Sequence, residues 1–173
     1  KDKYGVIYAD PPWYFKSYSK KGEGRNATQH YPCMNLEDIC KLPVGDLAKD
    51  NSVLLMWAVD PLLDQAFKVI DAWGFKYKTV GFTWAKTNSK SLGFFTGLGY
   101  WTRSNPEMCL LATKGKPKRN SKSIPQLVVE QRQEHSRKPD IVYNHIENML
   151  DGPYVELFAR RKRNNWHSWG NEV

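Results

Sequence analysis

Apolar runs of strand length recur along the chain, separated by segments in which apolar residues have helical spacing. Strands are expected where the apolar runs are continuous, at 4–9, 53–59, 77–85, 107–113 and 153–159, with a shorter one at 125–130. One helix is expected to begin at Asp60 and Pro61, because Asp can cap a helix and Pro suits its first position, and to end at Gly74. A second helix is expected to begin at Pro139, and a short one near Asn35.

This alternation of strands and helices predicts an α/β fold, with a mostly parallel sheet and helices on both faces, in a single domain over residues 1–173. Ligands of such sheets bind outside the carboxyl ends of the strands. The long polar loop 10–34 and the loops 86–104 and 114–124 follow predicted strands, so they are expected to surround the site.

Charge and composition indicate the kind of partner. The 173 residues include 26 Lys and Arg against 18 Asp and Glu, which gives a net charge of +8, and seven of them are Trp. Positive charge with many aromatic rings suits neutralisation of a phosphate backbone and stacking on bases, which indicates a nucleic-acid partner. No apolar run approaches the ~18 residues of a membrane-spanning helix, so no membrane partner is expected.

The cysteines give no sign of a metal site. Cys33, Cys40 and Cys109 match no zinc or redox spacing, so no metal ion is expected. The thiols are interpreted as reduced, partly buried side chains of a cytoplasmic protein.

The sequence Asp10-Pro11-Pro12-Trp13 directly follows the first predicted strand. The two prolines fix φ and remove two amide donors, so a stiff turn can present the carbonyls of Asp10 and Pro11 beside the Asp10 carboxylate. Trp13 offers a flat surface for a planar ligand. Acceptors that converge beside such a ring suit the exocyclic amine of a nucleobase. The alternative is an ordinary proline turn with Trp13 packed in the core.

Together with further segments, this motif resembles the MT-A70 family of adenine N6-methyltransferases. The matching segments are A-D-P-P-W at 9–13, L-L-M-W-A-V at 54–59, W-G-F at 73–75, T-W-A-K-T-N at 83–88, E-M-C-L-L-A-T-K-G at 107–115, R-K-P-D at 137–140, E-L-F-A-R at 156–160 and N-W-H-S-W-G-N-E at 165–172. The family includes eukaryotic mRNA methyltransferases and bacterial or phage DNA methyltransferases, and this chain looks more like the second branch. The resemblance implies a Rossmann-like methyltransferase fold in permuted order, with the catalytic motif before the cofactor strand, and S-adenosylmethionine as the cofactor.

The resemblance also implies roles for individual residues. Asp10 would lie between the cofactor and the target amine, the turn of Pro11 and Pro12 would supply a carbonyl acceptor, and Trp13 would flank the base. Cofactor contacts are expected from Asp10, Lys114, Glu156, Phe158, Arg160, Asn171 and Glu172. The strand at 153–159 lacks the glycine pattern of most methyltransferases, so no glycine-rich loop is expected to hold the cofactor.

Basic residues gather in three segments after predicted strands, which favours a surface that follows the phosphate backbone. The candidates for nucleic-acid contact are Lys16, Tyr18, Lys20, Lys21, Arg25, Lys118 and Arg119, and the third cluster is 160–163. All three clusters are expected on one edge of the sheet.

The expected reaction is an in-line displacement in which N6 of an adenine in DNA attacks the methyl group. The alternatives are the same reaction on RNA and a non-catalytic nucleic-acid-binding subunit of a methyltransferase complex. A homodimer or a hetero-partner subunit is compatible with a domain of this size, and the expected location is the cytoplasm, as for a bacterial or phage-encoded intracellular enzyme.

Overall fold

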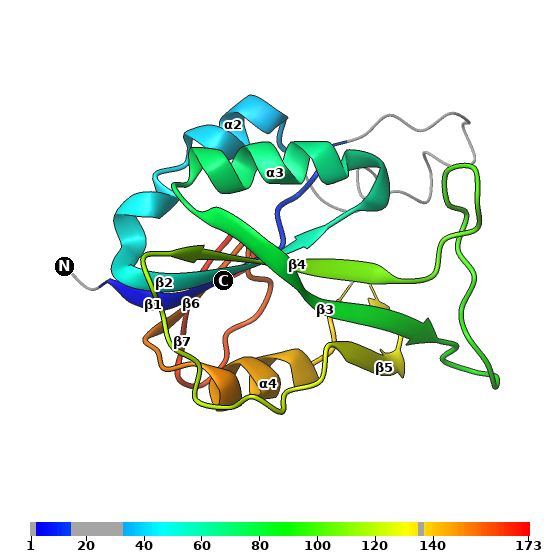
Figure 1. The fold of residues 1–173 in the computed structure, drawn as a ribbon. Coiled ribbons are helices and arrows are strands. Elements are labelled where there is room, and N and C mark those ends of the chain that lie inside the picture. Colours follow the sequence, from blue (N-terminus) through cyan, green and yellow to red (C-terminus); the bar gives the residue numbers. More distant parts are fainter. Residues whose placement is uncertain (1–2, 15–32, 135–136) are drawn as a thin grey trace.

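The computed structural model describes residues 3–14, 33–134 and 137–173, which form a seven-stranded sheet between helices (Figure 1). The strands are β1 Tyr4–Ala9, β2 Ala48–Ala58, β3 Lys76–Thr87, β4 Glu107–Lys114, β5 Leu127–Gln131, β6 Tyr154–Leu157 and β7 Trp166–Trp169. The helices are α2 Leu36–Lys41, α3 Leu63–Ala72 and α4 Ile141–Met149, with 3₁₀ turns at Val44–Leu47 and Asp60–Leu62. None of these helices is long and apolar enough to cross a membrane.

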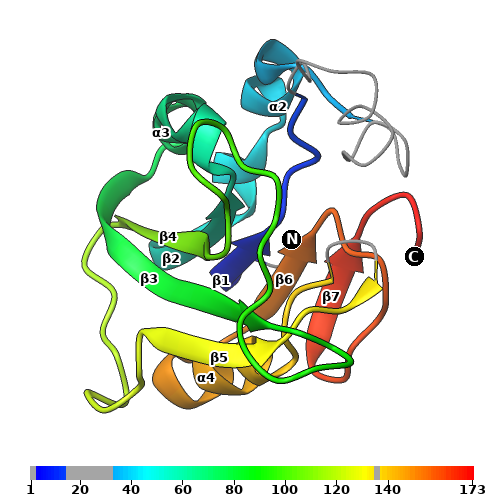
Figure 2. The ribbon, with the colours of Figure 1, turned by 90° about the vertical axis from the view of Figure 1, so that its right-hand side faces the viewer.

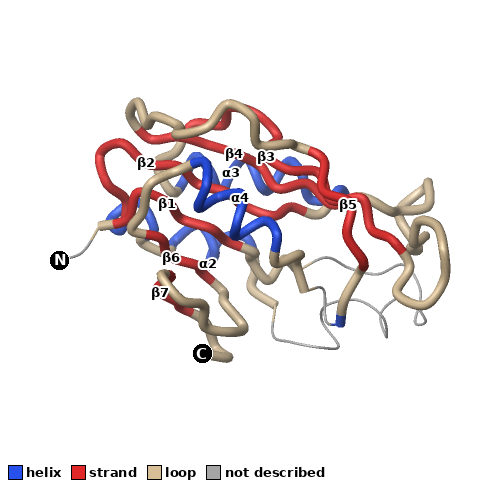
Figure 3. Tube along the Cα trace, turned by 90° about the horizontal axis from the view of Figure 1, so that it is seen from below, coloured by secondary structure: helices blue, strands red, loops and turns tan. Residues whose placement is uncertain are grey.

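The strand order is β5-β3-β4-β2-β1-β6-β7, so the first strand of the chain is near the middle of the sheet. Figure 3 follows this order from β4 through β2 and β1 to β6 and β7. The pairs β1–β2, β1–β6, β6–β7 and β3–β5 are parallel, whereas β4 runs antiparallel to both β2 and β3. The mostly parallel α/β sheet is therefore confirmed, with one reversed strand inside it.

Successive side chains of the central strands supply two cores. Ile7 and Met56 belong to the core under α2 and α3, whereas Tyr8 and Trp57 belong to the core under α4 on the other face. Figures 1 and 3 show these helices on opposite sides of the sheet, as predicted. Because both faces are covered, a ligand can reach the central strands only at their ends.

The structure shows one of the two helix caps expected from the sequence. The Asn35 side chain accepts a hydrogen bond from the Asp38 amide at 2.9 Å and caps α2, as expected. Asp60 makes no capping hydrogen bond, because the chain passes through a 3₁₀ turn at Asp60–Leu62 before α3 begins at Leu63. The expectation of a helix capped by Asp60 is therefore wrong in its details, although Gly74 ends that segment at φ +83°.

Two strand predictions also need correction. The expected last strand at 153–159 is followed by a further strand, β7, which pairs parallel with β6. The predicted strand 53–59 begins earlier, at Ala48, because the polar residues before Val53 continue the extended backbone.

Candidate active site

The Asp10-Pro11-Pro12-Trp13 turn begins where β1 ends, at the carboxyl edge of the sheet and next to both β2 and β6. Its backbone is fixed by hydrogen bonds: the Trp13 amide donates to the Pro11 carbonyl at 2.8 Å, and the Met34 amide donates to the Pro12 carbonyl at 2.9 Å. The Pro11 carbonyl, expected as an acceptor for a ligand, therefore already accepts one hydrogen bond and keeps one lone pair. Asp10 remains the group of this turn with an accessible charge.

Trp13 lies inside the molecule. Its side chain is only 4% exposed, packs in the core under α2 and α3, and donates from Nε1 to the Trp57 carbonyl at 3.1 Å. The alternative interpretation, a Trp packed in the core, is thus the arrangement of this structure, and a contact between Trp13 and a base stays a prediction. The neighbouring ring of Tyr14 is 55% exposed.

A chain of ion pairs begins at Asp10. The Lys138 Nζ lies 3.4 Å from the Asp10 carboxylate and 2.8 Å from the Glu107 carboxylate, and Glu107 also pairs with Lys86 Nζ at 2.9 Å. Lys138 further lies 5.4 Å from the centre of the Trp57 ring, within cation–π range. The lysine and Glu107 side chains are 11–17% exposed, so the charges interact with little screening by water.

This network gives its two carboxyl groups opposite properties. Burial raises the pKa of Asp10, and the nearby charge of Glu107 adds to this effect, while Lys138 opposes both. Burial also acts to raise the pKa of Glu107, but Lys138 and Lys86 outweigh it and hold that pKa at about 2. Glu107 is therefore a fixed negative charge, whereas Asp10 takes up a proton at a higher pH than Glu107 does.

A pocket opens beside Asp10, between the ends of β1 and β6. It is lined by Tyr8, Asp10, Trp57, Arg137, Lys138, Tyr143, Glu156, Phe158, Arg160 and Arg161. Both Glu156 carboxylate oxygens lie 2.8 Å from the Tyr143 hydroxyl, which donates to them. Because carboxylates and cations face the same space, the pocket suits a ligand that carries both signs of charge.

The segment that follows β7 contacts Arg160, one of the residues that line this pocket. Arg160 Nε lies 3.6 Å from the Glu172 carboxylate, and the Ala159 amide donates to the Trp169 carbonyl at 2.9 Å. A Cβ at Gly170 would lie 2.4 Å from the Ala159 carbonyl oxygen, so only glycine permits this approach. Phe158 has φ +60°, an unfavourable backbone for a residue with a side chain, of the kind found at functional sites.

Six of the seven predicted cofactor residues form two groups. Asp10, Glu156, Phe158 and Arg160 line one pocket, and Asn171 and Glu172 form the exposed turn that follows β7, where Glu172 pairs with Arg160. Their contacts with a cofactor stay predictions.

Lys114 lies at the opposite edge of the sheet, level with Ser52 and about 15 Å along the strand direction from Asp10. Its Nζ donates to the Gly45 carbonyl at 3.2 Å. Because β4 is antiparallel to β2 and not parallel as expected, its last residue, Lys114, lies away from the pocket beside Asp10, which argues against the predicted cofactor contact.

The antiparallel direction of β4 also changes where the predicted nucleic-acid contacts Lys118 and Arg119 lie. Lys118 and Arg119 follow β4 and lie at the far edge, where the neighbouring Asn120 bonds to Asp151 at the end of α4. The expectation of three basic clusters on one edge is therefore wrong for this cluster, whereas 160–163 follows β6 at the same edge as Asp10. The other candidates, Lys16, Tyr18, Lys20, Lys21 and Arg25, lie outside the described residues.

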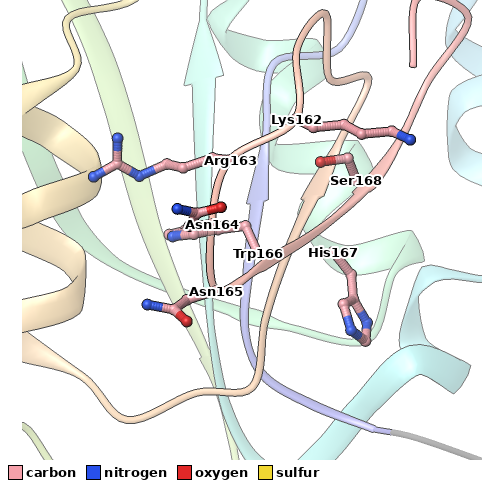
Figure 4. A pocket seen from close by; sticks show the side chains of 7 residues that line it. All are labelled: Lys162, Arg163, Asn164, Asn165, Trp166, His167 and Ser168. Atoms are coloured by element: carbon pink, nitrogen blue, oxygen red, sulfur yellow. The ribbon is translucent and has the colours of Figure 1, made fainter.

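A second, open depression is formed by consecutive residues 162–168 on the outer side of β7, where Figure 4 shows their polar side chains. It contains none of the predicted catalytic or cofactor residues, although Lys162 and Arg163 belong to the predicted basic cluster 160–163. Arg163 at its rim is already engaged by Glu147 at 3.5 Å and by Asn144 at 2.8 Å.

Lys86, Glu107 and Lys138 lie in segments that match the family pattern, but no role was predicted for them from the sequence. Each lies near the start or end of an element: Lys86 is the second-last residue of β3, Glu107 begins β4, and Lys138 lies three residues before α4. A signal was present, because charged residues directly beside strand ends in an α/β fold reach the ligand edge. What was missing was the direction of β4, which brings Glu107 to this edge.

Comparisons with known proteins place this chain in a family. The MT-A70 family model matches residues 4–172. The chain is 34% identical to the type II methyltransferase M.MunI of a Mycoplasma species, over 99% of this chain and 78% of that protein. It is also 29% identical to the N(6)-adenosine-methyltransferase MT-A70-like of Arabidopsis thaliana and 26% identical to the human N(6)-adenosine-methyltransferase catalytic subunit METTL3. It spans 24% and 28% of their lengths. From this match over nearly its whole length, the chain belongs to the MT-A70 family of adenine N6-methyltransferases.

Proposed function

We propose that this protein transfers a methyl group from S-adenosylmethionine to the exocyclic N6 amine of adenine in DNA. The observation that carries the proposal is the Asp10 carboxylate at the end of a central strand, beside a pocket of mixed charge. DNA is favoured over RNA because M.MunI, a relative of which this chain covers 78%, is a type II methyltransferase. Both DNA and the cofactor are found inside cells, which supports a cytoplasmic location.

The residues around the pocket fit S-adenosylmethionine. The cofactor carries a carboxylate, an ammonium group and a sulfonium, and the pocket offers cations at Lys138 and Arg160 and carboxylates at Asp10 and Glu156. In addition, the Nε atom of Arg137 in this lining is buried and has no hydrogen-bond partner among the described residues. When bound, S-adenosylmethionine supplies an electrophilic methyl group.

The side chains of this chain would contribute by position and charge. The Asp10 carboxylate accepts a hydrogen bond from the N6 amine and stabilises the positive charge that develops on that nitrogen. Asp10 need not be a strong base, because the amine becomes acidic only after it is methylated. Lys138, held by Glu107, keeps the Asp10 carboxylate in place, and the fixed turn of Pro11 and Pro12 limits its motion.

Cofactor binding is expected to depend on pH through Glu156. Burial raises the pKa of Glu156 to about 7, although the hydrogen bond from Tyr143 lowers it. Above this pKa the carboxylate is charged and attracts a cation, and below it the carboxyl is neutral, so the affinity for S-adenosylmethionine should rise as pH increases through 7. Calorimetric titrations on both sides of this pH measure the effect, and Glu156→Gln should flatten the profile. A profile that is identical in the wild type and Glu156→Gln contradicts this role.

Methyl transfer from radiolabelled S-adenosylmethionine to matched DNA and RNA oligonucleotide pools tests the proposed function. Incorporation into DNA adenine is the expected result. Transfer to RNA alone would favour the alternative suggested by the adenosine methyltransferases among the relatives. Cofactor binding without transfer to either pool would indicate a non-catalytic subunit or the need for a homodimer or hetero-partner, and transfer to cytosine would overturn the assignment of the base.

A further inference from the structure

The loop between β3 and β4, residues 88–106, projects beyond the carboxyl end of β3 (Figures 1 and 2). Its two stems meet where Trp84 pairs with Glu107 across the antiparallel strands. Lys86 at the first stem is connected to Asp10 through Glu107 and Lys138 by ion pairs of 2.9, 2.8 and 3.4 Å. The β3–β4 loop therefore rises next to the candidate active site.

This loop has a defined internal structure. The Asn105 side chain bonds to both the amide and the carbonyl of Lys86 and also donates to the Phe95 carbonyl, which joins the two stems. Farther out, the Gly97 amide donates to the Ser104 carbonyl at 2.6 Å. The guanidinium of Arg132, just past β5, lies 4.2 Å from the centre of the Phe95 ring and supports the loop from the side.

At its tip the loop holds Trp101 in water. Trp101 is 93% exposed, and its backbone has φ +72°, a conformation that is costly for a bulky residue. The turn depends on Gly99, where a Cβ would lie 2.0 Å from the Thr102 carbonyl oxygen, so the strained geometry is built into the loop. The Trp101 ring makes an edge-to-face contact with Tyr100 at 6.4 Å between ring centres, but both rings are exposed, so packing within the described residues does not account for this strain.

The surroundings of Trp101 point to a polyanion with flat bases. Tyr100 and Phe94 in the same loop are 54% and 61% exposed. Residues 87–106 include Lys90 and Arg103 but no Asp or Glu. Exposed rings among uncompensated positive charges are the arrangement with which proteins hold unpaired nucleotides, by stacking and backbone attraction. Protein interfaces also use exposed aromatic rings, so it is the excess of positive charge in this loop that favours a polyanion over a protein partner.

We propose that the β3–β4 loop is a nucleic-acid clamp in which Trp101 stacks on a base of the DNA next to the target adenine. The proposal rests on the proposed function, because it supplies what that reaction needs. An adenine within a duplex must leave the base stack before its amine can reach Asp10, and an exposed ring on a loop whose stem adjoins the site can stack on the bases exposed by this step.

The test compares Trp101→Gly with wild type. Glycine relieves the strained backbone and removes the ring, so thermal stability should stay equal or rise while DNA affinity falls by at least about five-fold. Affinity is measured by fluorescence anisotropy with a short labelled DNA pool of random sequence, single-stranded and duplex. Trp101→Phe, which keeps a stacking ring, should restore most of the binding. Leu92→Ala is the matched control, because it removes a fully exposed apolar side chain from the same loop without removing a ring.

The outcomes separate the alternatives. Equal DNA affinity in wild type and Trp101→Gly overturns the clamp, whatever the result of the methyl-transfer assay. Analytical ultracentrifugation distinguishes a protein interface: if wild type self-associates and both Trp101→Gly and Leu92→Ala dissociate it, the loop is an oligomer contact and the proposal is wrong. Failure of wild type to methylate DNA while Trp101→Gly still weakens DNA binding would reject the proposed function and leave the clamp standing.

Discussion

Replacement of Asp10 by Ala is expected to lower methyl transfer by about 10³-fold while leaving thermal stability equal to or above that of wild type. The loss follows because the carboxylate is the acceptor aimed at the charge that develops on the amine, and removal of one such group costs ~3–4 kcal/mol of transition-state stabilisation. S-adenosylmethionine should still bind, since the other charged side chains of the pocket remain.

The stability expected of Asp10→Ala comes from the sign of the pKa shift. The folded protein raises the pKa of Asp10 above its ordinary value, chiefly by burial, so the ionised form is less favourable in the folded than in the unfolded state. This cost is absent at low pH and is fully present once pH exceeds the raised pKa, so removing the carboxyl relieves it at neutral pH. Lys138 keeps Glu107 as a partner in the variant.

Single-turnover transfer and thermal melting measure the two effects, and Asp10→Asn serves as a variant of the same shape. If Asp10→Ala transfers methyl groups at the wild-type rate, Asp10 has no catalytic role. If Asp10→Ala instead fails to fold, Asp10→Asn is compared with wild type in its place, and this variant should be folded and retain little activity.

Replacement of Glu107 by Gln is expected to destabilise the protein by about 3–5 kcal/mol, because it leaves two largely buried lysines, Lys86 and Lys138, without their shared anion. The pKa of Glu107 is about 2 in the folded protein, below its ordinary value, so its stabilising effect is complete above that ordinary value and is lost as pH falls through about 2. Urea unfolding at neutral and at acidic pH should show the difference between wild type and variant shrinking toward low pH.

Glu134→Gln provides the matched control for this prediction. Glu134 also faces two cations, Arg137 and Arg161, at 3.6 and 4.0 Å, but its side chain is 60% exposed, so its removal should change stability little.

A second readout isolates the effect on Asp10: without the charge of Glu107, the pKa of Asp10 should fall, and the acid limb of the pH–rate profile should move to lower pH. An unfolding curve of Glu107→Gln that matches Glu134→Gln would show that the ion-pair chain contributes nothing.

The sequence allowed the fold class and the position of Asp10 to be predicted, because both depend on local patterns. The apolar run before Asp10 and the prolines after it indicate a strand that ends in a fixed turn, whichever strands become its neighbours. Asn35 was likewise recognisable as a cap from the residues that follow it.

The direction of β4 was not accessible in this way. A strand pattern reads the same in both directions, so nothing in residues 107–114 distinguishes a parallel from an antiparallel neighbour. Lys114 was consequently placed at the wrong edge, and Glu107 was overlooked although it lies at the right one. The burial of Trp13 was undecided for a related reason, since it depends on α2 and α3, which pack over it from later in the chain.

The antiparallel pairing of β3 and β4 has a consequence for how specificity could be changed. Glu107 lies opposite Trp84 across the stem of one hairpin and pairs diagonally with Lys86, so this ion pair depends on the strand register rather than on the residues of the loop. Residues 88–104 can therefore be exchanged as a cassette for a loop of different length or composition, with Asn105 kept to tie the stem. The active-site residues around Asp10 would stay in place while the loop that approaches the substrate is replaced. The β3–β4 hairpin is therefore a position where substrate specificity could be changed without altering the catalytic residues.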